Sequence, residues 1–225
     1  MMRTRLTGQL LGLALFIATP VAAQTSQPAM IPIVENEFVQ VSQVTFYPGK
    51  TPLEMPPSGL PALIVVLHSK AFVPAQGASS EPNSWSFQSA KYLAGSGVLR
   101  SGPFDEKETI RQMFITLKSW PPSAPFEKDA VKLDPAHNKV VFENDRVRVV
   151  HLNFPPGASG PVVDKRMRVI VMLTDSHAIV TRPDGTTAVR DGKVGAISYS
   201  KGGSQATLNA GTTPLENIVV ELKGK

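Results

Sequence analysis

The sequence repeats itself, and the repeat sets the size of the folding unit. The segment FENDRVRVVHLNFPPG, at 142–157, has a diverged copy, VENEFVQVSQVTFYPG, at 34–49. A second match lies downstream, because LIVVL at 63–67 resembles VIVML at 169–173. Self-similarity at a nearly constant spacing indicates a duplication. Each copy spans about 90 residues, a plausible size for one small domain, so the repeat predicts two similar domains.

A proline-rich segment separates the two copies. The stretch SWPPSAPFEKDAVKLDPA, at 119–136, contains four prolines. Proline interrupts regular secondary structure and is typical of connections between elements. We therefore expect an N-terminal domain at 31–118, a linker at 119–136 and a C-terminal domain at 137–225.

The second copy alternates short β-branched runs with turn signals, a pattern typical of antiparallel strands. The strands expected in it are 139–143, 146–154, 168–173, 177–182, 186–190, 194–200, 205–208 and 215–222. Eight short strands predict a small barrel or jelly roll. The first copy is less regular: we expect strands near Trp85 and Tyr92, and a long loop elsewhere in 73–104, which is rich in Gly and Ser. The expected fold is all-β, with two tandem jelly-roll barrels.

The N-terminus has the features of a secretory signal peptide. Arg3 and Arg5 precede an apolar run at 10–18, and small residues at 21–23 follow Pro20. These features predict cleavage after Ala23, removal of 1–23, and a mature protein that is periplasmic or secreted. The apolar run is much shorter than the roughly 20 residues of a membrane-spanning helix, so no membrane span is expected.

Composition excludes several classes of function. The chain contains no cysteine, which excludes disulfides, thiolate metal sites and anchoring through a lipid-modified cysteine. Its formal net charge is only +5, and aromatic residues make up 7% of the chain. Nucleic-acid binding is usually accompanied by a concentrated basic patch. The basic residues here are scattered, so we expect no nucleic-acid partner.

The second copy resembles a cupin, and the two copies together resemble a bicupin. The resemblance rests on Pro156-Gly157 at a strand end, the apolar strand at 169–173, the hairpin RPDG at 182–185, the strand at 195–199, and NAGTTPL at 209–215. It covers nearly the whole mature chain. It implies two cupin-like barrels in tandem.

The metal-binding motif of the cupins is degenerate in both copies. Cupins usually carry a His-x-His pair about six residues after the first glycine, and another His shortly before the asparagine. Counting from Gly157, these places hold Val163, Lys165 and Gln205. The same count in the first copy gives Met55 and Pro57. Transition metals prefer imidazole, thiolate and carboxylate ligands, so the resemblance implies that the metal site is lost, and no metal or cofactor is expected.

A dense charge cluster at 164–168 is the first candidate for ligand binding. Arg166 and Arg168 belong to it, and arginine binds planar anions well. Strand alternation is expected to turn Asp164 away from its neighbours. An alternative is that these charges lie on a solvated strand edge and discourage edge-to-edge pairing. The resemblance places further polar residues near the same cavity: Tyr199, Gln205 and Asn209.

The function that these features favour is binding. We expect an exported, degenerate bicupin that binds a small molecule, anionic or sugar-like, as a metal-free binding or accessory protein of the cell envelope. The alternative is a metal-independent cupin enzyme, such as a sugar isomerase or epimerase, with His151 or Tyr199 as acid or base. A metal enzyme with unusual ligands, such as His68 or His177, is a third hypothesis. We expect a monomer with two packed barrels, or a homodimer.

Overall fold

The computed structural model of the chain describes residues 30–46, 53–55, 59–68, 90–93, 99–101, 110–124 and 126–225. The expected signal peptide, Trp85 and most of the expected loop at 73–104 lie outside these residues. Within them the chain is all-β apart from a one-turn helix, α1 (Ala130–Leu133). No helix in these ranges is long and apolar enough to span a membrane.

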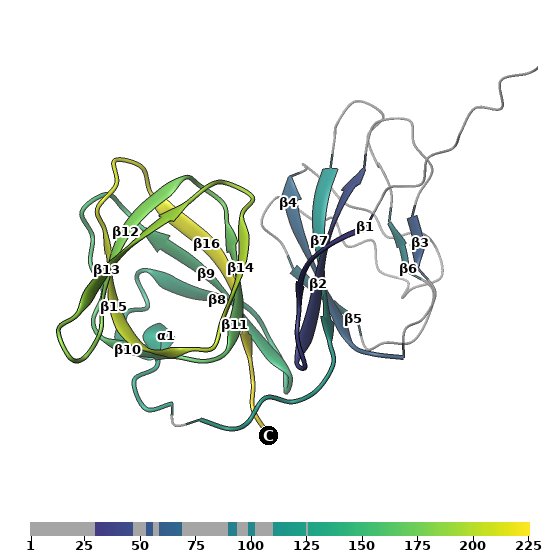
Figure 1. Ribbon diagram of the computed structural model, residues 1–225, viewed down its shortest axis with the longest axis horizontal. Coiled ribbons are helices and arrows are strands. Elements are labelled where there is room, and N and C mark those ends of the chain that lie inside the picture. Colours follow the sequence, from purple (N-terminus) through teal and green to yellow (C-terminus); the bar gives the residue numbers. More distant parts are fainter. Residues whose placement is uncertain are drawn as a thin grey trace, which may run out of the picture.

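The N-terminal strands form a five-stranded antiparallel sheet and a two-stranded ribbon (Figure 1). The sheet has the order β1-β2-β7-β4-β5, built from β1 (Met30–Glu35), β2 (Val39–Phe46), β7 (Ile110–Leu117), β4 (Ala62–His68) and β5 (Ala90–Leu93). The ribbon pairs β3 (Leu53–Met55) with β6 (Leu99–Ser101). Tyr92 lies in β5, as the sequence predicts.

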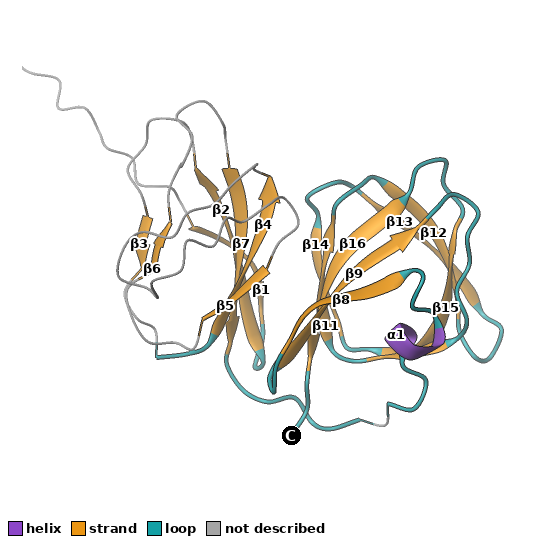
Figure 2. Cartoon of the chain, turned by 180° about the vertical axis from the view of Figure 1, so that it is seen from behind, coloured by secondary structure: helices purple, strands orange, loops and turns teal. Residues whose placement is uncertain are grey.

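The C-terminal strands form two antiparallel sheets that face each other in a jelly-roll-like arrangement (Figure 2). One sheet has the order β14-β11-β16-β9-β8, built from β14 (Ile197–Ser200), β11 (Arg168–Met172), β16 (Leu215–Leu222), β9 (Val147–Phe154) and β8 (Asn138–Glu143). The other has the order β10-β15-β12-β13, built from β10 (Val163–Lys165), β15 (Gly203–Asn209), β12 (Ser176–Thr181) and β13 (Thr187–Gly192). All eight strands expected here are present, and β10 is the additional one.

The repeated segments form the same hairpin in both parts of the chain. Asn36 lies in the β1–β2 turn, where its side-chain oxygen accepts the backbone N–H groups of Phe38 and Val39 at 2.8 and 3.0 Å. Asn144 does the same in the β8–β9 turn, with two N–H contacts of 2.9 Å. Asparagine suits this position because its short side chain can satisfy backbone groups inside a turn. The two five-stranded sheets also have equivalent strand orders.

One apolar core joins the two five-stranded sheets. Val39 and Val41 of β2 belong to the same buried cluster as Val147 and Val149 of β9. Strand side chains alternate between the two faces of a sheet, so β9 also presents a second set, which includes Leu152, to the interior of the C-terminal part. The C-terminal five-stranded sheet therefore packs with its outer face against the N-terminal five-stranded sheet. Its inner face points toward the C-terminal four-stranded sheet (Figure 1).

Candidate anion-binding site

A cavity of about 660 Å³ lies between the two C-terminal sheets. We call it the interior cavity. Its walls combine apolar side chains, such as Ile170 and Val180, with the polar or charged residues Lys165, Arg168 and Gln205. Mostly apolar clefts of 300–1,000 Å³ with a few convergent polar groups are typical of small-molecule sites. The interior cavity has the size and lining of such a site.

Three charged residues cross the five-stranded sheet in one row. Arg148 on β9 pairs with Glu221 on β16, and Glu221 pairs with Arg168 on β11. Directly opposed residues in neighbouring strands share a face of the sheet. Arg168 lines the interior cavity, so the row lies on the inward face. The exposed fractions are 5% for Arg148, 4% for Glu221 and 8% for Arg168.

Arg148 is fully paired. Its guanidinium donates to both carboxylate oxygens of Asp129, at 2.8 and 3.0 Å, and its Nε donates to Glu221 at 2.7 Å. Burial opposes ionisation of Asp129, but the hydrogen bonds from Arg148 and from the Val131 amide outweigh it and keep the pKa of that carboxyl below its usual value. Asp129 also caps α1. The ion pairs therefore fasten the segment before β8 to the sheet.

Arg168 lies in the same row without such a partner. Its Nε is buried and makes no hydrogen bond, and the guanidinium forms no ion pair with any residue in the described ranges. Burial lowers its pKa to about 10, and the nearby charge of Glu221 only partly opposes this. The side-chain oxygen of Asn217, which lines the same cavity, is also buried without a hydrogen bond. Buried polar groups are normally satisfied, so these two atoms lack the hydrogen-bond partner that such groups usually have.

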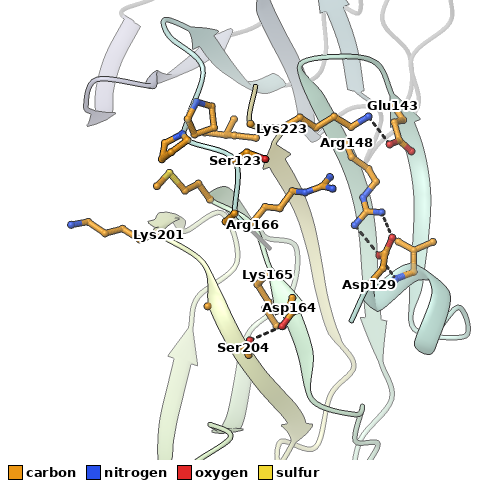
Figure 3. Close-up of a pocket in the computed structure, with 18 of the residues that line it drawn as sticks. Ser123, Asp129, Glu143, Arg148, Asp164, Lys165, Arg166, Lys201, Ser204 and Lys223 are labelled. Atoms are coloured by element: carbon orange, nitrogen blue, oxygen red, sulfur yellow. Dashed lines mark hydrogen bonds and ion pairs between the residues drawn. The ribbon is translucent and has the colours of Figure 1, made fainter. Parts of the chain in front are cut away.

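Lys165 adds a second cation to the cavity wall. Burial and the charge of Arg168 lower its pKa to about 7, against the opposing effect of Glu221. The neighbouring carboxylate of Asp164 forms no ion pair with Lys165. It accepts a hydrogen bond from Ser204 at 2.6 Å (Figure 3). It also accepts the backbone N–H groups of Glu127 and Lys128 at 3.0 and 2.8 Å. The orientation of Asp164 away from its neighbour confirms the expected alternation. A side chain at Gly202 would collide with the Lys165 carbonyl, so this glycine lets the β14–β15 turn pack on the strand.

A second hollow of about 700 Å³ lies beside the linker at 121–124 (Figure 3). We call it the linker pocket, and Lys165 borders both cavities. Its carboxylates are largely satisfied inside the protein: Asp129 by Arg148, and Glu143 by Lys223 at 2.7 Å. The interior cavity is the better candidate because it is lined by a buried cation, Arg168, that has no ion-pair partner among the described residues.

The five residues predicted to bind a ligand lie in different places. Arg168 and Gln205 line the interior cavity. Tyr199 borders it, but this residue pairs with Val169 and packs against the core between the two five-stranded sheets. Burial first, and the charge of Glu37 second, raise the pKa of its phenol.

The remaining two predicted ligand residues have structural contacts elsewhere. Arg166 stacks on the ring of Phe126, 3.9 Å from its centroid, and lines the linker pocket. Asn209 has 0% exposure, and its side-chain nitrogen donates to the carbonyls of Phe154 and Thr213, both at 2.8 Å. The side chain of Asn209 thus fixes the turn before β16. The structure does not bring Arg166 or Asn209 into the interior cavity.

The positions assigned to the degenerate metal motif lie together. Val163 on β10 pairs directly with Gln205 on β15, and Lys165 follows two residues later on the same strand. Side chains two residues apart share a face, so all three lie on the inward face of this sheet. Among the residues that the structure describes, no group of three or more His, Cys, Asp or Glu could hold a metal ion.

The histidines occupy separate environments. His151 pairs with Ile218 of the core between the sheets, and its Nε2 lies 3.7 Å from a carboxylate oxygen of Glu216. This places it on the opposite face from the interior cavity. His177 is exposed, with its Nδ1 2.6 Å from Asp191. The side chain of His68 lies outside the described part.

Sequence reasoning missed Arg148, Glu221 and the role of Lys165. A signal for the first two exists: each is a single charged residue within a β-branched strand, VRVVHL and NIVVEL. One neighbour two residues away, Val150 or Val219, is apolar and buried. A charge at such a position implies a buried partner. Lys165 has no comparable signal, because β10 is three residues long and contains two charges.

Comparisons with known proteins identify the fold. No family model matches the sequence, and no curated protein matches it. Among solved structures, protein Ylba from E. coli is similar over 87% of this chain and 83% of its own, with a TM-score of 0.61 and 11% identity. A cupin 2 conserved barrel domain protein from Leptotrichia buccalis matches over 90% and 92%, with a TM-score of 0.55 and 8% identity.

A third similar structure is a salicylate 1,2-dioxygenase from Pseudaminobacter salicylatoxidans. It matches over 85% of this chain and 75% of its own, with a TM-score of 0.58 and 8% identity. At such low identities the likeness concerns the fold alone. The chain has the all-β fold of the cupin proteins, as the resemblance in its sequence predicts.

Proposed function

We propose that this chain is an exported bicupin with degenerate metal sites, and that it binds a small anionic molecule in the interior cavity. The observation that carries the proposal is the buried guanidinium of Arg168, which faces the cavity without a partner among the described residues. Leaving a charge buried and unpaired is unfavourable by several kcal/mol. A ligand carboxylate would supply the missing counter-charge.

The balance of charge around the cavity favours an anion over a neutral sugar. Lys165, Arg168, Arg190 and Lys193 line the cavity, whereas Asp191 is the one carboxylate among its lining residues. Glu221, which acts on both Lys165 and Arg168, is already bound by Arg148 at 2.7 Å. Positive charge therefore exceeds negative charge around the cavity. Organic acids and sugar acids present the planar carboxylate that a guanidinium binds through two hydrogen bonds.

The proposed tandem organisation, with domains at 31–118 and 137–225, is supported by the equivalent strand orders of the two five-stranded sheets. The repeated Asn turns support it as well. Export and a role in the cell envelope follow from the N-terminal sequence alone. N-terminal sequencing of the protein made in cells tests this part: the mature chain should begin at or next to Gln24, and a soluble product that keeps Met1 would contradict it.

A ligand screen tests the binding proposal. Thermal unfolding is measured with a panel of organic acids, sugar acids and matched neutral sugars. A ligand that binds only the folded state raises stability by RT ln(1 + [L]/Kd), so acids should raise the Tm and neutral sugars should not. Arg168→Met should remove the shift, whereas Arg166→Met, the matched control outside the cavity, should retain it. Equal shifts in both variants would place the site elsewhere.

We do not extend the proposal to an isomerase or epimerase. His151 lies on the opposite face of the sheet from the cavity, and Tyr199 packs against the core between the sheets. A general acid or base must reach within hydrogen-bonding distance of the substrate. His151 does not have that position relative to the interior cavity; Tyr199 borders the cavity, and no other described candidate acid or base accompanies it in the alternative.

A further inference from the structure

Lys165 lines the interior cavity, and its amine has no hydrogen-bond or ion-pair partner among the residues that the structure describes. Lys165 lines both the interior cavity and the linker pocket, so a small molecule in either one can reach it. No hydrogen bond or ion pair joins its side chain to another residue in the described ranges. The adjacent carboxylate of Asp164 is held by Ser204 and by backbone amides. The half-buried side chain of Lys165 is therefore not held by a salt bridge.

The charged groups that face this amine favour its neutral form. Arg168 approaches from β11 and repels a second positive charge, while Glu221 on β16 is engaged by Arg148. Together with burial, this lowers the pKa of Lys165 to about 7. A lysine that is desolvated next to another cation is a recognised form of activated nucleophile. An amine needs a free electron pair to attack a carbonyl carbon, and Lys165 has one in a large fraction of molecules at neutral pH.

We propose that Lys165 forms a reversible imine with a carboxylate that also carries a carbonyl group, such as a 2-oxo acid or an aldehyde acid, while Arg168 binds its carboxylate. This inference rests on the proposed anion site and names its ligand class. The amine electron pair adds to the carbonyl carbon, and the π pair of the C=O bond moves to oxygen. A proton then moves from the nitrogen to that oxygen and gives the carbinolamine, which loses its hydroxyl group and the second nitrogen proton as water to form the imine. Addition of water releases the acid again, so no oxidant or reductant takes part.

Reductive trapping tests the proposal on the whole mature chain. The protein is incubated at pH 7 with glyoxylate or pyruvate and sodium cyanoborohydride, and modified lysines are identified by peptide mass spectrometry. An ordinary lysine has a pKa of about 10.4, so well under 1% of it is neutral at this pH. Lys165 should therefore be labelled at least about tenfold faster than Lys201, an exposed lysine that borders only the linker pocket. Its labelling rate should rise with a midpoint near pH 7.

Variants make the outcome specific. Lys165→Met should lose the dominant adduct, and Lys201→Met should keep it. Arg168→Met should slow labelling of Lys165, because it removes the guanidinium that binds the carboxylate of the acid. The same guanidinium is the positive charge that repels a protonated Lys165. Labelling of Lys165 at the rate of Lys201, or equal labelling with and without Arg168, would overturn the imine.

Failure of the imine and failure of the anion site give different results. Lactate has a carboxylate but no aldehyde or ketone group, so it tests the anion site alone. A Tm raised by lactate, with no glyoxylate adduct at Lys165, would overturn the imine and leave the proposed function intact. An unchanged Tm with every acid, together with no adduct, would overturn both.

Discussion

Arg148 and Arg168 flank Glu221 in one row of the same sheet, and both are buried, yet only one is paired. Arg148, beside the linker, binds two carboxylates. Arg168, beside the interior cavity, binds none in the described part of the chain. The two arginines have nearly the same burial and the same charge, so they differ in the carboxylates that surround them. On the linker side Arg148 fastens the chain to the sheet, and on the cavity side Arg168 is the residue that we propose binds an anionic ligand.

The largest effect should come from breaking the paired side. Arg148→Met leaves the buried carboxylates of Asp129 and Glu221 without their hydrogen-bonded cation. Removing one partner of a buried pair typically costs about 3–5 kcal/mol. Urea unfolding at neutral pH should show a loss of this size. A loss below about 1 kcal/mol would mean that the network does not fasten the linker to the sheet.

Lys165→Met should change stability in a manner that depends on pH. The pKa of this amine falls from 10.5 to about 7 on folding, while Arg168 and Glu221 remain charged neighbours over most of this range. Between these values the unfolded chain holds the proton and the folded chain does not, so the stability of the parent rises with pH. The variant should therefore be more stable than the parent near pH 6, by about 1–3 kcal/mol, with an advantage that shrinks toward pH 10.

Parallel urea unfolding of Lys165→Met and the parent, at several pH values from 6 to 9, measures this advantage. Lys201→Met is the control, because it removes a lysine from an exposed position. An advantage of Lys165→Met that grows with pH would contradict the assigned burial of the amine.

Arg168→Met should separate binding from stability. The substitution removes a buried charge and leaves no ion-pair partner behind, so the Tm of the free protein should stay the same or rise. An anionic ligand should bind at least about tenfold more weakly, since truncating one side of a buried charge pair commonly costs more than this. Calorimetric titration with the best acid of the screen measures the loss. A strong fall in Tm would show that Arg168 has a structural partner after all.

Arg166→Met should have the smallest effect and sharpens the contrast with Arg168. Its guanidinium lies over the ring of Phe126, and an exposed contact of this kind contributes about 0.5–1 kcal/mol. Stability should fall by no more than that, and acid affinity should change less than twofold. A larger loss of affinity would move the site toward the linker pocket.

Much of the C-terminal fold could be predicted from local patterns. The alternation of β-branched residues gave the eight expected strands, and the repeated Asn marked the same turn twice. The strand β10 was missed because Val163–Lys165 is short and mostly charged. Arg166 and Arg168 are two residues apart and were expected to act together. They do not, because β10 ends at Lys165 and β11 begins at Arg168, so the alternation is interrupted between them.

The sequence by itself determined the duplication, the all-β class and the strands that face a core, because each of these depends on residues close together in the chain. Only the tertiary structure decided which buried charges are paired. Asp129, Arg148 and Glu221 come from three separate segments and meet through strand register. The same register leaves Arg168 facing a cavity. Burial without a partner is a property of the space around a side chain, and no local sequence pattern specifies that space.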